Sequence, residues 1–108
     1  MMNEKIKKAL DSIGVKCFFQ HRGDYKGECV VYTHISNPLS YADNRETARE
    51  YTILLNVYSK EDIENKNEMV RKAMIKNGFR GGIVKTPMLL ENGFTNTAIQ
   101  FKCDLLES

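Results

Sequence analysis

The last quarter of the chain carries the pattern that most constrains its fold. From Ile99 to Leu105 apolar and polar residues alternate strictly. This period of two is typical of a strand with one face buried and one face in water. The pattern therefore predicts a sheet whose two sides differ, and the apolar positions are Ile99, Phe101, Cys103 and Leu105.

Four earlier segments predict further strands of this sheet. β-branched and aromatic residues are frequent in them, as is usual in strands. Residues 51–58 alternate most regularly among the four and are the best candidate for the central strand. In residues 79–86 the pair Gly81-Gly82 either weakens the strand or marks a bulge, and Pro87 ends the segment. The four segments are residues 15–19, 29–35, 51–58 and 79–86.

Two amphipathic helices should cover the sheet. Residues 3–13 repeat apolar side chains at helical spacing, and Gly14 suits a left-handed C-terminal cap. For the second helix, Ser59 is a candidate N-cap with Asp62 three residues later. Asn77-Gly78 supplies the stop. The expected fold is α+β, with two helices packed on one face of a four- to five-stranded mixed or antiparallel sheet, in the order α-β-β-β-α-β-β.

Residues 37–49 predict an exposed loop between two strands. Asn37-Pro38 should close the preceding strand, and the segment that follows is polar and charged without a clear period. A loop of this length in a small domain is usually functional or disordered. Leu39 and Tyr41 amid charges of both signs suit a polar protein interface. A merely solvated loop is the equal alternative.

Length and composition set the outer limits. The 108 residues fit one domain, 1–108, with 42% hydrophobic and 28% charged residues and a net charge of +2. That charge gives no strong reason to expect nucleic-acid binding. No apolar stretch approaches the roughly 20 residues of a membrane span, and no signal peptide is expected. The odd number of cysteines, three, suits a reducing compartment.

No residue pattern predicts catalysis, a cofactor or a metal. Cys17 with His21, or Cys29 with His34, could be drawn as zinc or nucleophilic pairs, but buried structural cysteines are the stronger interpretation. Residues 78–82 lack the lysine and preceding strand of a phosphate-binding loop. The acidic residues at 61–64 suit the first turn of a helix. We expect no enzyme activity and no cofactor.

The chain resembles the tail-terminator, tail-completion and head-tail joining proteins of long-tailed bacteriophages and prophages. The resemblance covers most of the sequence. It lies in the order of an opening helix at residues 6–10, a strand at 30–32, a polar segment leading into residues 51–59, and a helix directly afterwards. These are patterns of type and order, without an invariant chemical signature.

The resemblance implies a structural protein that self-associates into a ring, possibly a hexamer, and contacts the tail-tube or head-connector proteins. Such a protein would act in the host bacterial cytoplasm during assembly, then in the virion tail or neck. It would need no direct nucleic-acid binding, membrane or small-molecule substrate. A ring requires two different contact patches per subunit, and an exposed strand edge could supply one of them. The residues proposed for these contacts are Leu39, Tyr41, Asn44, Arg45 and Glu46.

Two other functions stay open on the sequence alone. One is a small bacterial adaptor or regulatory module that binds proteins. The other is a minor enzyme without a recognisable site, which would need a concave pocket where titratable groups converge.

Overall fold

The computed structural model describes residues 2–42, 45–90 and 92–106, of which 39–42, 45–47 and 106 are described by their backbone alone. The described chain has two helices and a six-stranded mixed sheet, an α+β fold as the sequence predicted. The elements run α1 (Met2–Asp11), β1 (Cys17–Phe19), β2 (Cys29–Ala42), β3 (Arg45–Ser59), α2 (Ile63–Lys76), β4 (Arg80–Val84), β5 (Met88–Leu89) and β6 (Thr95–Leu106).

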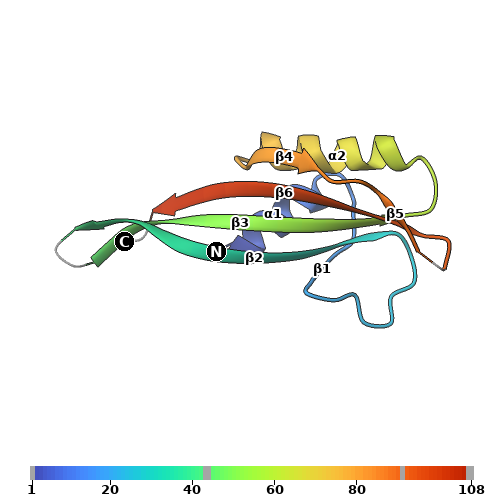
Figure 1. Ribbon diagram of the computed structural model, residues 1–108, viewed down its shortest axis with the longest axis horizontal. Coiled ribbons are helices and arrows are strands. Elements are labelled where there is room, and N and C mark those ends of the chain that lie inside the picture. Colours follow the sequence, from blue (N-terminus) through green and yellow to red (C-terminus); the bar gives the residue numbers. More distant parts are fainter. Residues whose placement is uncertain (1, 43–44, 91, 107–108) are drawn as a thin grey trace.

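The sheet has the strand order β1-β2-β3-β6-β4, with β5 also paired to β6 (Figure 1). The short β1 runs parallel to β2, and the other pairs are antiparallel. Residues 51–58 lie in β3, which has β1 and β2 on one side and β6, β4 and β5 on the other. They therefore form a central strand, as predicted.

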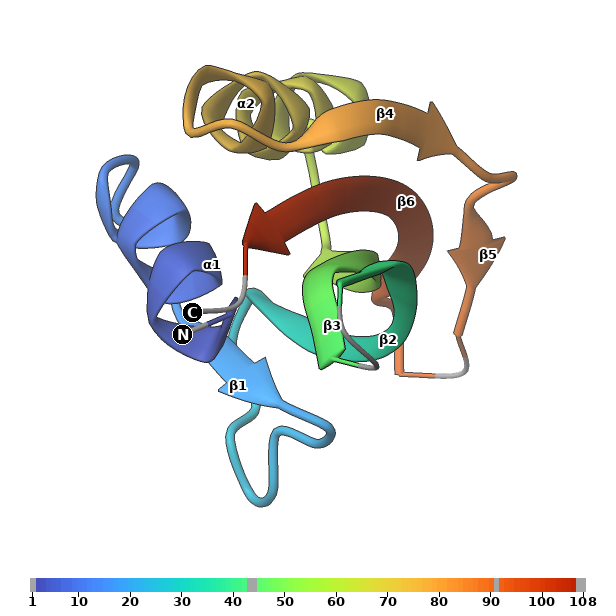
Figure 2. The ribbon, with the colours of Figure 1, turned by 90° about the vertical axis from the view of Figure 1, so that its left-hand side faces the viewer.

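Both helices pack on one face of the sheet. Figure 2 shows α1 and α2 along the same side of the curled strands. Their buried side chains, such as Leu10 and Met74, meet the buried face of β2, β3 and β6 in one core. Phe101, at the centre of β6, is fully buried. The strictly alternating pattern of β6 therefore reflects a difference in burial between the two faces of the sheet. The face opposite the helices is called the outer face below.

The structure confirms several local predictions. Gly14 ends the first helix with φ +71°. Asn77 caps α2, and the backbone N–H of Phe79 donates to the carbonyl of Met74 at 3.1 Å. The register of β4 against β6 shifts between Gly81 and Ile83, as expected for a bulge at the two glycines. At Gly14, Gly81 and Gly82, and at Gly78 after Asn77 with φ +95°, a glycine that tolerates positive φ stands where the chain changes course.

The prediction of a loop at residues 37–49 was wrong. β2 continues through Pro38 to Ala42, and β3 begins at Arg45, so the segment forms the far end of a long antiparallel hairpin. The register shifts between Pro38 and Ser40 and again between Ser40 and Tyr41, and such bulges increase twist. The hairpin projects beyond the helices and gives the protein extents of 53 × 26 × 24 Å (Figure 1).

Two further differences concern the ends of elements. Ser59 does not cap α2; it is the last residue of β3, because it pairs with Thr95 of β6. The helix begins at Ile63 behind Asp62, which has φ 54° and makes no side-chain capping hydrogen bond. The sixth strand, β5, was not predicted, and with two residues it is too short to leave a periodic signal.

Candidate interaction surface

One side of β2 lacks a neighbouring strand over much of its length. β1 pairs only with residues 30–32 of β2. Val30 N–H donates to the carbonyl of Lys16, and the carbonyl of Tyr32 accepts from Gln20 N–H, both at 2.9 Å. Even-numbered residues of β2 therefore direct their backbone groups toward the β1 side. Within the described residues no strand follows β1 along this line, so residues 33–38 form an open edge.

The backbone groups of this open edge can be assigned from the same alternation. The register between β2 and β3 is unbroken from Cys29 to Pro38, so His34 and Ser36 also point away from β3. The carbonyl of Ser36 has a long contact, 3.5 Å, from Arg49 Nη2, while Arg49 Nε donates to Ser36 Oγ at 3.1 Å. Pro38 faces the same side, where its missing N–H costs no ladder hydrogen bond.

The opposite edge of the sheet is built differently. Gly81 and Gly82 in β4 have φ of +98° and +68°, and the resulting bulge interrupts the flat row of donors and acceptors. Arg71 of α2 donates from Nε to the carbonyl of Gly82 at 3.2 Å. A bulge and a covering side chain are both ways in which proteins protect a sheet edge. The β4 edge is therefore protected at its bulge. On the β2 edge Arg49 reaches the carbonyl of Ser36, but the N–H groups of His34 and Ser36 have no neighbouring strand within the described residues.

The outer face of the sheet carries exposed apolar side chains, Ile35 beside the open edge and Ile83 on β4 at the other edge. Ile35 is 67% exposed and Ile83 57% exposed. Leu54, on β3, is half-buried and lies diagonally across from Ile35, whose direct partner is Thr52. Large apolar side chains left in water on an uncovered sheet face favour contact with another surface.

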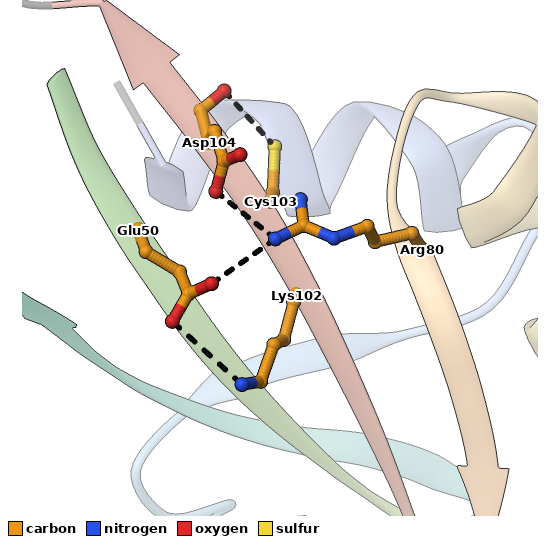
Figure 3. A network of polar contacts seen from close by, with 5 residues as sticks. All are labelled: Glu50, Arg80, Lys102, Cys103 and Asp104. Carbon is orange, nitrogen blue, oxygen red and sulfur yellow. Dashed lines mark hydrogen bonds and ion pairs between the residues drawn. The ribbon is translucent and has the colours of Figure 1, made fainter. Parts of the chain in front are cut away.

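A network of charges lies on the same face, close to the hairpin. Glu50 of β3 and Asp104 of β6 are direct cross-strand partners, and like charges in that position repel. Arg80 Nη2 lies 3.1 Å from a carboxylate oxygen of each, and Lys102 Nζ lies 3.6 Å from the other oxygen of Glu50 (Figure 3). The network joins β3, β4 and β6 and leaves two cations balanced by two carboxylates.

His34 connects the open edge to the first helix. Its Nε2 lies 2.6 Å from Asn3 Oδ1, and its ring packs 5.4 Å from Phe19 and 5.8 Å from Tyr51, between centroids. Burial lowers the pKa of this imidazole, because removal from water disfavours the charged form. The neutral ring therefore suits its place between the two aromatic residues.

Four of the five residues predicted as contacts fall on the far end of the hairpin. Leu39 and Tyr41 belong to β2, and Arg45 and Glu46 to β3, with Tyr41 paired to Glu46. Asn44 lies outside the described residues, as do the side chains of the other four. The backbone brings the four described residues to one end of the hairpin, continuous with the open edge. Sequence reasoning missed the edge because the expected end of the strand at Asn37-Pro38 hid its continuation.

The cysteines and histidines predicted not to form a metal or nucleophilic site are distributed over the fold. Cys29 and Cys103 are buried, Cys17 is half-buried, and all three are free thiols. Burial raises the pKa of each thiol, which reduces the thiolate needed for attack. Among the described residues, no three His, Cys, Asp or Glu side chains cluster closely enough to hold a metal ion.

One concave pocket has an apolar lining, with a volume of about 300 Å³. Val57, Val70 and Ser59 lie in its wall, with Glu28 and Lys66 at the same site. The two charges pair with each other, Lys66 Nζ lying 2.7 Å from Glu28 Oε1. This bond, the largest influence, lowers the pKa of Glu28. The ionised pair lacks the raised carboxyl pKa that a general acid would need.

The comparisons with known proteins give no family assignment. No protein-family model matches the chain, and no curated protein matches it. Within the described residues no helix is long and apolar enough to cross a membrane.

Proposed function

We propose that this protein is a structural assembly subunit that binds copies of itself, and partner proteins, through the open edge of β2. The role that fits is that of a tail terminator or head-tail joining protein of a bacteriophage or prophage. The observation that carries the proposal is the row of outward-facing backbone groups at His34 and Ser36, which have no neighbouring strand within the described chain.

Strand addition at such an edge supplies affinity through main-chain hydrogen bonds and register through the alternating side chains. The incoming strand would lie beside the exposed Ile35 on the outer face and the half-buried His34 on the other face. The edge lengthens into the projecting hairpin, which carries the binding surface away from the helices. Elongation of this kind suits a subunit that must reach its neighbour.

A closed ring needs a second, different patch on each subunit. The outer face offers one, because Ile83 on β4 is exposed there and lies across the sheet from the open edge. Contact between the β2 edge of one copy and this region of the next is head-to-tail and closes if the rotation per subunit divides the circle.

Proline at position 36 tests the proposal. Ser36→Pro removes the outward N–H while the ladder to β3 keeps its donors, and Ser36→Ala is the matched control because both variants lose the same hydroxyl. Native mass spectrometry, with and without tail-tube protein, should show the same oligomers for wild type and Ser36→Ala. Association of Ser36→Pro should weaken by roughly tenfold or more.

Two results would contradict the proposal. One is equal assembly of Ser36→Pro and Ser36→Ala when both variants show the circular dichroism of the wild type. The other is a wild-type protein that stays monomeric at every concentration and binds no tube protein. An adaptor role would be favoured instead if the wild type stayed monomeric yet bound a foreign peptide strand at the same edge.

A further inference from the structure

At the end of the molecule opposite the projecting hairpin, the β1–β2 connection approaches the turn that precedes β6 (Figure 1). A surface pocket of about 520 Å³ lies between them. Arg22, Lys26 and Lys60 line it together with the single carboxylate of Asp24. Cationic groups thus predominate in a pocket that the proposed assembly function does not use.

Arg22 is held in place by aromatic rings. Its guanidinium carbon lies 4.6 Å from the centroid of Tyr58 and 5.4 Å from that of Phe94. Its Nη1 is buried, and the guanidinium also lies beside the Cys29 thiol, whose pKa is raised by burial and lowered to a smaller extent by Arg22. The rings and the thiol therefore fix the plane of the guanidinium at the wall of the pocket.

Lys60 brings a second positive charge to the same ring. Its Nζ lies 5.2 Å from the centroid of Phe94, so two cations share one aromatic side chain and repel each other. Within the described part of the chain, Asp24 forms no ion pair with either of them. The nearby Glu28 is engaged by Lys66 Nζ and by the backbone N–H of Lys60. Cationic side chains therefore outnumber carboxylates in the lining of this pocket.

We propose that this pocket binds an oxyanion, a carboxylate or a phosphate group, between Arg22 and Lys60. A guanidinium presents paired N–H donors to either group, and stacking fixes its plane in advance. Nucleic acid is disfavoured as the source, because single strands bind through open aromatic faces. Here Phe94 is only 6% exposed, and the rings of Tyr58 and Phe94 already carry cations.

The test is a nuclear magnetic resonance titration of the wild type with inorganic phosphate and, separately, with acetate, at constant ionic strength. Saturable shifts are expected at the Arg22 side-chain N–H and at the backbone amide of Phe94. Saturation by phosphate alone identifies a phosphate site, saturation by acetate alone identifies a carboxylate site, and saturation by both identifies a general oxyanion site. Failure of both probes to saturate these signals overturns the proposal.

Three variants distinguish binding at this specific site from non-specific attraction of anions to a positively charged protein. Lys60→Gln and Arg22→Lys should each weaken binding by roughly tenfold or more, the second because lysine keeps the charge but loses the paired donors. Lys85→Gln, an exposed lysine outside the pocket, should bind as the wild type does. Equal weakening in all three variants contradicts the proposal. So does saturation by a single-stranded oligonucleotide when neither small anion binds.

Discussion

The two ends of the β2–β3 pair have the same ladder but different surroundings. At residues 30–32 of β2 the strand has β1 on one side, β3 on the other and helices above its inner face. From residue 33 onward it has β3 alone, and the hairpin leaves the helices behind (Figure 1). One end lies in the core of the fold, and the other presents the N–H groups of His34 and Ser36 without a neighbouring strand in the described chain. The proposed function thus places binding and stability in different parts of one strand.

The largest expected effect on stability comes from comparing a core side chain with a side chain on the open part of β2. Phe101→Ala empties a fully buried position in the core and should lower the free energy of unfolding by about 3–5 kcal/mol. Ile35→Ala, at a position 67% exposed on the open part of β2, should change it by no more than about 0.5 kcal/mol. Urea unfolding measures both. Similar losses of unfolding free energy for the two variants would contradict the proposed difference between the two regions.

The protected edge should depend on its glycine bulge. Gly82→Ala places a Cβ at φ +68°, 3.1 Å from Arg71 Nε, and should destabilise the protein by about 1–2 kcal/mol. Asn37→Ala on the exposed β2 edge is the control and should change stability little. Thermal or urea unfolding compares them. A Gly82→Ala variant as stable as Asn37→Ala would show that the bulge does not constrain β4.

Arg80 should contribute less than the bulge. Arg80→Ala leaves Glu50 and Asp104 facing each other, but Arg80 is half-exposed, so the expected loss is at most about 1 kcal/mol. In 1 M salt the loss should shrink, because the screening length falls to about 3 Å. Lys85→Ala should show neither effect. A loss that is independent of salt would mean that Arg80 acts through packing.

The smallest effect concerns pH and His34. Because burial lowers the pKa of His34 in the folded protein, the unfolded chain binds the proton more readily. Stability should therefore decrease as pH falls below about 6.5, the ordinary value, toward the folded pKa. His34→Gln should reduce this slope in urea unfolding across that window, whereas His21→Gln, at an exposed position, should keep it. An unchanged slope in His34→Gln would assign the pH dependence to other groups.

The sequence predicted the elements whose periodicity reflects one-sided burial. The alternation in β6, the central place of residues 51–58 and the glycines that end both helices were all readable, because each has a local physical cause. The hairpin at residues 37–49 was not. Pro38 and the charged residues after it have the composition of a loop. Proline is compatible with a strand where its missing N–H faces an open edge. Whether Pro38 lies at such an edge depends on the order of the strands in the sheet, which the local sequence does not give.

Other features depend on distant partners and leave no local pattern. Ser59 has the residue type of a helix cap, but its pairing with Thr95 holds it in β3. The cationic pocket joins Arg22, Lys60 and Phe94 from three separate segments. No spacing rule connects them, so only the folded chain brings them together. The predicted contact residues stay a prediction; the structure shows only that Leu39, Tyr41, Arg45 and Glu46 belong to β2 and β3 rather than to a loop.

Amide hydrogen exchange of β2 tests the central claim most directly. The N–H groups of His34 and Ser36 face the open edge, whereas those of Thr33 and Ile35 face β3. At low concentration the first pair should exchange fast and the second pair slowly. As native mass spectrometry shows oligomers forming, protection should rise at His34 and Ser36 while Thr33 and Ile35 stay protected. Fast exchange at His34 and Ser36 in the assembled protein would contradict the claim that this edge joins the subunits.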